Sequence, residues 1–167
     1  MGAKLLNSMK KILFLLLALL PLLGMAQQKG TIEYLDANPC FGDIMLGDSI
    51  THNLRKLDFL GDKPEKGGFR CKVSELDLKK DCYKMGDAVP FAIFVDVDNY
   101  LIKNILVFVK IGNTEELQVI KWLMRNYGDS KEKEPLNWFG KKASVMAGYS
   151  DDLKTFYVHF CDLTQLK

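Results

Sequence analysis

The chain has 167 residues, 48% of them hydrophobic and 26% charged, which is the composition and length of one ordinary globular domain. Its formal net charge is only +2, and Lys4, Lys10 and Lys11 all lie close to the N-terminus. Without these three side chains the rest of the chain is slightly acidic. Because binding to nucleic acid depends on clustered basic side chains, this balance argues against a nucleic-acid partner.

The N-terminal segment has the pattern of a cleavable export signal. A basic start is followed by an almost purely apolar run from Ile12 to Leu23 and by small residues ending at Ala26. The run is shorter than the roughly 20 residues that span a bilayer, and Pro21 interrupts it. We therefore expect a signal peptide at residues 1–26 and a single domain at residues 27–167, located in the periplasm or outside the cell. The alternative is an uncleaved membrane anchor.

Four cysteines, Cys40, Cys71, Cys82 and Cys161, follow the predicted signal peptide. An even number of cysteines in an exported chain favours disulfides, and four cysteines allow three pairings. One pairing joins Cys71 to Cys82 in a local hairpin and Cys40 to Cys161 across the domain. Buried free thiols are the alternative. Zinc binding is not expected, because Cys-x-x-Cys is absent and the chain has only two histidines.

In chain order, the first predicted helix covers residues 48–60. Ile50, Leu54 and Leu57 are spaced by four and three residues, so they would share one face of that helix. Ser49, or the aspartate before it, can cap the N-terminus, and a glycine follows the last helical position. The pattern predicts an amphipathic helix that packs on a sheet.

Strand patterns dominate the rest of the chain. The clearest are residues 91–97 and 101–109, which are rich in β-branched and aromatic side chains and are separated by turn residues, Asp98 and Asn99. We expect this hairpin at the centre of the sheet. The other predicted segments are strands at residues 31–35, 69–76, 136–149 and 153–161, and a charged, turn-like stretch at residues 77–87.

The second predicted helix follows Asn113, its expected N-cap, and ends at Gly128. Four apolar side chains repeat along it at helical spacing, namely Ile120, Leu123, Met124 and Tyr127. Strands joined by hairpins, with helices before and after them, predict an α+β fold. In this fold a mainly antiparallel sheet of about four to six strands is packed by two helices.

The segment from Ile44 to Thr51 contains Gly-Asp-Ser and resembles the first block of the GDSL/SGNH esterase family. The resemblance implies a nucleophile at Ser49, beside a histidine base at the end of a parallel sheet. However, His52 lies too close in sequence to be that base, and His159 is preceded by Phe156 where the family has aspartate. We therefore interpret the serine as a helix cap and predict no catalytic residue.

Three weaker patterns have structural explanations. Asp96 to Asn99 resembles the start of a calcium loop but lacks the later glycine and glutamate, so a hairpin turn is expected. His159 lies in a strand pattern without a second metal ligand at useful spacing. Trp122 and Trp138 could form a binding platform, but packing is the more common role of tryptophan. No metal and no cofactor is predicted.

The order of motifs along the chain resembles small exported proteins of the BamE/SmpA-like family. The matching features are Phe41 to Gly47, the helix to Leu60, the hairpin at 91–109, Tyr127-Gly128, Trp138 and Cys161-Asp162. The resemblance implies the fold of that family and a location in the cell envelope. BamE is a lipoprotein that assists outer-membrane protein assembly, and Gln27 stands where a lipidated cysteine would be. Its activity is therefore not expected here.

These patterns together predict a non-enzymatic binding or scaffold protein of the cell envelope. Its partner would be an unidentified envelope or extracellular protein. Two alternatives stay open, an esterase of the GDSL type that uses Ser49 and a secreted protein inhibitor.

Overall fold

The computed structural model describes residues 28–164, except residues 66, 67, 111 and 113. The predicted signal peptide and the helix cap predicted at Asn113 lie outside the described residues. Within the described part of the chain, no helix has both the length and the apolar composition of a transmembrane span.

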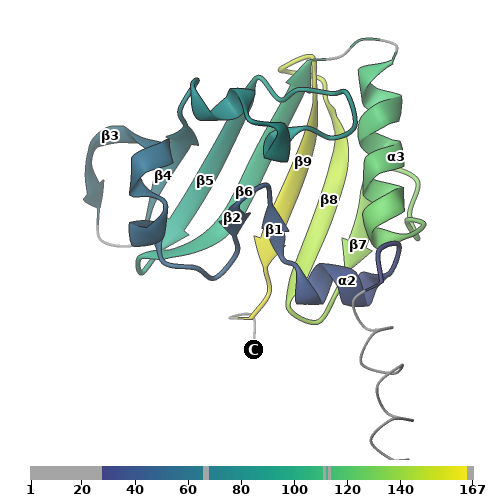
Figure 1. Ribbon diagram of the computed structural model, residues 1–167, viewed down its shortest axis with the longest axis horizontal. Helices are drawn as coiled ribbons and strands as arrows, with labels where there is room; N and C mark the ends of the chain where they lie inside the picture. Colours follow the sequence, from purple (N-terminus) through teal and green to yellow (C-terminus); the bar gives the residue numbers. More distant parts are fainter. Residues whose placement is uncertain (1–27, 66–67, 111, 113, 165–167) are drawn as a thin grey trace, which may run out of the picture.

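Seven antiparallel strands form one sheet in the order β3-β4-β5-β6-β9-β8-β7 (Figure 1). They are β3 (Leu57–Glu65), β4 (Gly68–Val73), β5 (Ala92–Asp98), β6 (Leu101–Lys110), β7 (Leu136–Phe139), β8 (Ala143–Ser150) and β9 (Thr155–Asp162). Strands adjacent in the chain are adjacent in the sheet, except that β9 pairs with β6. The chain leaves β6 through a helix and returns as the meander β7–β8–β9.

Short elements form a second layer on one side of this sheet (Figure 1). The longest is the helix α3 (Glu115–Tyr127), and the others are α2 (Ile32–Ala37) and the hairpin of β1 (Cys40–Phe41) and β2 (Ile44–Met45). Four 3-10 turns complete the list, namely η1 (Ile50–His52), η2 (Leu54–Lys56), η3 (Asp77–Lys79) and η4 (Asp81–Tyr83).

The hydrophobic core lies between this layer and one face of the sheet. Alternate residues of the central strands are fully buried there, namely Ile93, Val95, Ile105, Val107, Val158 and Phe160. The ring of Phe160 in β9 lies 5.5 Å from that of Phe41 in β1 and 6.5 Å from that of Tyr127 in α3, measured between centroids. The hairpin and α3 therefore pack on the same face of the sheet.

The predicted fold class is wrong in its balance of helix and sheet. The helix predicted at residues 48–60 is replaced by η1, η2 and the first residues of β3. Its apolar spacing does not match burial, since Leu54 is 46% exposed. Thr51 to Asn53 have low helix propensity, and from Leu57 the chain pairs with β4 instead. The described chain is thus a seven-stranded sheet with a two-stranded hairpin and one long helix, not four to six strands packed by two helices.

Other elements follow the sequence more closely. The central hairpin is confirmed as β5–β6, and its turn residues Asn99 and Tyr100 have φ of 49° and 63°, as in the type I′ turns that suit the twist of paired strands. The second helix is confirmed as α3. The strand predicted at 31–35 is wrong, because Thr31 caps α2 by accepting the N–H of Tyr34 at 3.3 Å.

Candidate functional site

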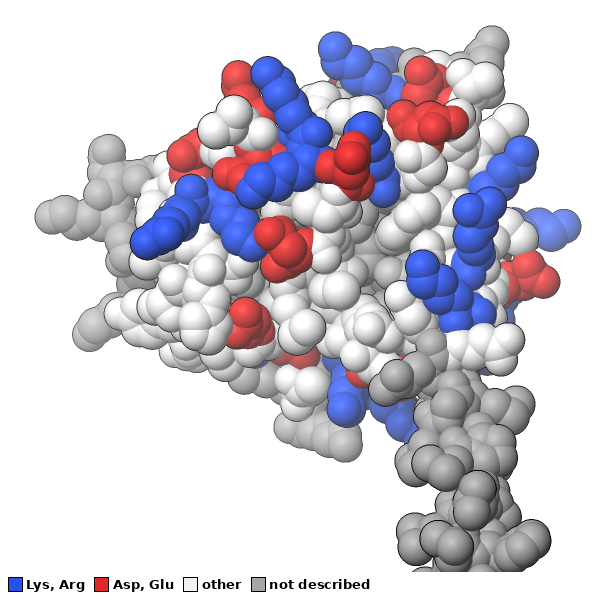
Figure 2. Space-filling view, viewed as in Figure 1, with Lys and Arg blue, Asp and Glu red and all other residues white. Residues whose placement is uncertain are grey.

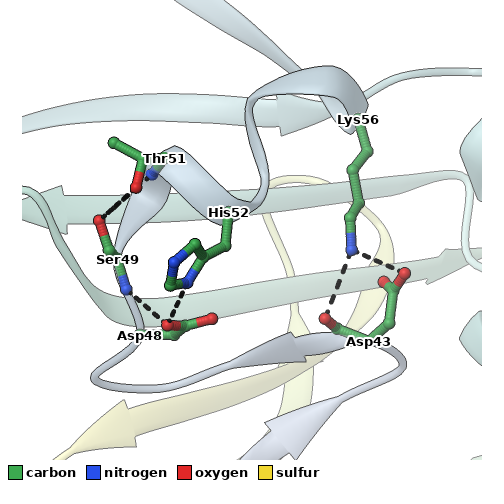
Figure 3. Close-up of polar contacts among 6 residues, drawn as sticks. All are labelled: Asp43, Asp48, Ser49, Thr51, His52 and Lys56. Carbon is green, nitrogen blue, oxygen red and sulfur yellow. Dashed lines mark hydrogen bonds and ion pairs between the residues drawn. The ribbon is translucent and has the colours of Figure 1, made fainter.

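Ser49, the candidate nucleophile, lies at the start of η1 (Figure 3). Its Oγ accepts the backbone N–H of Thr51 at 3.4 Å and lies 2.8 Å from the Thr51 hydroxyl. The serine is therefore a cap, as predicted, although it caps a 3-10 turn and not a helix. The nearby imidazole of His52 faces Asp48, with Nδ1 2.8 Å from Oδ1, and this hydrogen bond holds the pKa of Asp48 below its usual value.

The other histidine is far from this turn. His159 lies in β9 opposite Leu106 of β6, whereas Ser49 forms a bridge with Leu101 at the start of the same strand. Five residues of extended strand correspond to about 17 Å. The Nε2 atom of His159 lies 3.0 Å from Oδ1 of Asn104. The esterase alternative requires a parallel sheet with His159 beside the serine, and the structure has neither feature.

A second polar cluster lies on the β1–β2 turn, and Figure 3 shows its Asp43 and Lys56. Lys56 Nζ lies 2.7 Å from Oδ2 of Asp43, and the Tyr83 hydroxyl donates to Oδ1. Burial raises the pKa of Asp43, but Lys56 and Tyr83 outweigh it and the pKa lies below its usual value. Gly42, the other turn residue, has a φ of 62°, and a Cβ there would lie 2.5 Å from the Tyr83 ring. The cluster thus fixes a tight turn.

The four cysteines are all free thiols and lie within the described residues, so the structure gives no support to the predicted disulfides. Cys71 is fully buried in β4, where desolvation and the nearby Asp58 raise its pKa to about 11. Cys82 is exposed. In the part of the chain that the structure describes, no three His, Cys, Asp or Glu side chains are arranged to hold a metal ion.

Both tryptophans contribute to packing. Trp138 is 2% exposed and donates its indole N–H to the carbonyl of Gly128 at 2.9 Å. Trp122 of α3 is half-buried and meets the ring of Phe41 edge-on, at 6.0 Å between centroids. Neither side chain therefore forms the binding platform considered from the sequence.

The most unusual surface is the face of the sheet opposite the core, which we call the open face. Five half-buried apolar side chains of β5, β6, β8 and β9 lie on it, namely Phe94, Leu106, Phe108, Met146 and Tyr157. The pairing register places Phe94, Leu106, His159 and Met146 in one row across the sheet, so that the histidine separates the last two apolar side chains. Phe108 lies beside Tyr157 in the next row. In the same strands, the central residues that point to the core, such as Val95, Val107 and Val145, are fully buried. The difference shows that the two faces are covered unequally.

Aromatic rings cluster at one part of the open face. The Phe108 ring meets Phe94 edge-on at 5.7 Å and lies 6.4 Å from Phe91, which is 41% exposed. The guanidinium of Arg70 lies 6.0 Å from the centre of the Phe94 ring. Such a cluster offers a large, rigid contact area with a cation at its border.

One pair of charges on the open face is neutralised within the molecule, whereas Lys72, which the register places opposite Phe94, forms no ion pair among the described residues. Arg70 donates two hydrogen bonds to Asp96, at 2.5 and 2.9 Å, and this pairing raises the pKa of Arg70. Burial lowers the pKa of His159, which favours the neutral imidazole. The solvent-facing side of an antiparallel sheet is normally polar. A neutral, apolar stretch there has the properties of a surface that contacts another protein.

The outer surface of the opposite layer has a different character. Figure 2 shows positive and negative side chains intermingled along the upper part of that side, beside a wide area without charge, and the structure pairs Lys84 with Asp81 at 2.6 Å and Lys56 with Asp43 at 2.7 Å. Interspersed charges of both signs are typical of a solvated surface. The contrast makes the open face the candidate functional site.

The chain matches no family model, and neither a curated protein nor a solved structure is similar to it. The resemblance to BamE/SmpA-like proteins therefore has no support from these comparisons. The open face was not predicted as a site, because the sequence analysis placed residues 91–109 at the centre of the sheet and assigned no role to either of its faces.

Proposed function

We propose that this chain is an exported, non-enzymatic protein-binding module and that the open face is its binding surface. The row of apolar side chains on a half-covered sheet carries the proposal. The export pattern at residues 1–26 supports a location in the cell envelope or outside the cell. The partner would be a protein with an apolar, weakly charged surface, because the open face has no net charge at its centre.

The centre of the open face is where binding energy would concentrate. Complete burial of a leucine or phenylalanine side chain stabilises a complex by about 1.5–3 kcal/mol. Leu106 and Phe108 lie on the central strand β6 and are half-buried, so a partner would remove their remaining surface from water. Residues of this kind at the middle of an interface usually dominate affinity.

A photocrosslinking experiment tests this proposal in the native envelope. The photoreactive residue p-benzoylphenylalanine replaces Phe94, which preserves an aromatic ring at the border of the apolar row. The matched control places it at Leu117, which is 55% exposed on α3. We expect one dominant protein adduct from position 94 and none from position 117. Adducts of equal yield from both positions, or none from position 94, would overturn the proposal.

The captured protein then allows a quantitative test. We expect Leu106→Gln to weaken binding of the purified partner at least tenfold, because it places an amide in an apolar contact. Leu117→Gln, on the other side of the molecule, should leave affinity unchanged. Circular dichroism and thermal unfolding of both variants establish that the fold is retained. Equal affinity of the Leu106→Gln variant and the wild type would contradict the proposal.

A further inference from the structure

The two edges of the seven-stranded sheet are closed differently. At the β7 edge, the backbone N–H of Asn137 donates to the Ser130 hydroxyl at 2.9 Å, and the Asn137 carbonyl oxygen lies 3.1 Å from the same hydroxyl. The loop before β7 thus occupies the groups that another strand would need. Sealing of this kind prevents a sheet from growing at its edge.

The β3 edge presents its backbone groups outwards. The Ser74 N–H donates to the Lys56 carbonyl at 2.9 Å, in the same register as the β3–β4 pairing. Because hydrogen-bonded and non-hydrogen-bonded pairs alternate in an antiparallel ladder, Asp58 and Leu60 bond to β4, while the backbone groups of Phe59 point away from the sheet. This edge therefore offers one N–H and one carbonyl at its middle.

Edge strands usually carry lysine or proline, and β3 has Lys63 and Pro64 near its end, but two apolar residues, Phe59 and Leu60, lie at its middle. Phe59 is 50% exposed and Leu60 is 46% exposed, and they lie on opposite faces of the sheet. The Phe59 ring lies 5.5 Å from that of Phe69 in β4. An aromatic pair thus lies at the edge of the sheet, and the Phe59 ring is exposed on the side away from β4.

We propose that β3 pairs antiparallel with β3 of a second copy of this chain, so that two sheets join into one. In the favoured register Phe59 lies opposite the same residue of the other copy and exchanges two N–H···O bonds with it. Asp58 then lies opposite Leu60. If each strand moves by one residue, Asp58 lies opposite the same residue of the other copy, and like charges directly opposite each other are destabilising.

The geometry points to a second copy because the segment is self-complementary. Two-fold symmetry places the Phe59–Phe69 pair of each copy side by side, which forms a continuous row of four rings across the junction. The same symmetry turns both open faces to one side of the joined sheet. This pairing does not depend on the proposed function, but it would present that surface twice and increase avidity for a repeated partner.

The oligomeric state of the purified full chain tests the pairing. Sedimentation velocity over a concentration series should show a dimer, and Phe59→Lys should raise its dissociation constant at least tenfold. The matched control is Phe139→Lys, because Phe139 is 64% exposed on the sealed β7 edge. We expect this control to leave the dimer intact. A monomeric wild type at 100 μM, or equal effects of the two lysines, would overturn the proposal.

A crosslinking experiment tests the register without relying on a disruptive change. Directly opposite residues of a hydrogen-bonded pair have Cα atoms about 5.5 Å apart, which a disulfide can span. In a Cys82→Ser background, we expect Phe59→Cys to form an intermolecular disulfide on mild oxidation. Leu60→Cys, with similar exposure, should crosslink far more slowly because it lies opposite Asp58. Equal rates for the two cysteines, or none for position 59, would contradict the pairing.

Discussion

The carboxylate of Asp36, near the end of α2, holds the turn between β7 and β8. Oδ2 accepts the backbone N–H of Lys141 at 2.8 Å, and Oδ1 accepts those of Lys142 at 2.7 Å and Ala143 at 3.4 Å. Burial raises the pKa of Asp36, but the three donors outweigh it and the pKa lies below its usual value. We predict that Asp36→Ala leaves the fold intact and lowers its stability.

The size of the loss follows from these bonds. A hydrogen bond to a charged group contributes about 1.5–3 kcal/mol to stability. Asp36 is only half-buried, and water will replace part of what the turn loses. We therefore expect Asp36→Ala to lower the free energy of unfolding by about 2 kcal/mol, and Asp36→Asn by about 1 kcal/mol because it keeps one acceptor oxygen. With a urea m-value of about 1.5 kcal/mol/M, the midpoint of the alanine variant falls by about 1.3 M.

The pH dependence of this loss gives a sharper test. A carboxylate whose pKa is lowered on folding stabilises the protein fully above its unfolded-state pKa, which is about 3.9. The contribution disappears as the pH falls through the folded-state pKa. The difference in unfolding free energy between wild type and Asp36→Asn should therefore be constant from pH 5 to 7 and shrink below pH 4. A difference that stays constant down to pH 2.5 would refute the reasoning.

Gly140 provides an independent check on the same contact. A Cβ at this position would collide with Oδ1 of Asp36. Gly140→Ala should thus displace the carboxylate from its donors and cost about as much as Asp36→Ala. In the Asp36→Ala background the same change should cost about 1–2 kcal/mol less, since contacting residues are not additive. If the losses of unfolding free energy from Gly140→Ala and Asp36→Ala add in the double variant, the contact with the Asp36 carboxylate does not explain the cost of Gly140→Ala.

Three further predictions concern the polar clusters and the thiols. Ser49→Ala should lower the free energy of unfolding by about 0.5–1 kcal/mol in thermal denaturation, as expected for a cap, and any loss of turnover of short-chain esters would contradict this role. Tyr83→Phe should cost about 1–2 kcal/mol in urea unfolding, because it removes the donor to Asp43, and a cost near zero would contradict that contact. The exposed Cys82 should react rapidly with a thiol reagent in the native protein. The buried Cys71, with a pKa of about 11, should react only after unfolding. Equal labelling of the two cysteines, measured by mass spectrometry, would disprove the difference.

The sequence predicted elements well where a local pattern was long and unambiguous. In α3 the apolar stripe extends over about two turns, and Gly128 ends the helix with a φ of 83°. The segment at 48–60 was wrong because three apolar residues at helical spacing cannot outweigh weak helix formers and pairing with β4. The position of β9 beside β6 depends on a long-range pairing that no local pattern reveals.

The residues of the Gly-Asp-Ser motif have a conformational role in the turn before η1. Gly47 has a φ of 79°, which favours glycine. Asp48 Oδ1 accepts the N–H of Ser49 at 2.8 Å and bonds to His52, and the serine caps η1. All three residue types are therefore needed to turn the chain. The sequence shows that the histidine base of the esterase family has no counterpart at the expected position. It does not show which backbone conformation the motif adopts.

The signal for the open face was present in the sequence but had two explanations. Strands that are covered on one side alternate between apolar and polar residues, whereas strands covered on both sides are apolar throughout. Residues 91–97 and 101–109 are largely of the second kind, and the prediction placed them at the centre of the sheet without asking which face they leave uncovered. The structure covers only one of their faces, with α3 and the β1–β2 hairpin. Phe94, Leu106 and Phe108 thus have the composition of a core without a second layer. A partner protein that supplies this layer accounts for their composition, which solvent exposure alone does not.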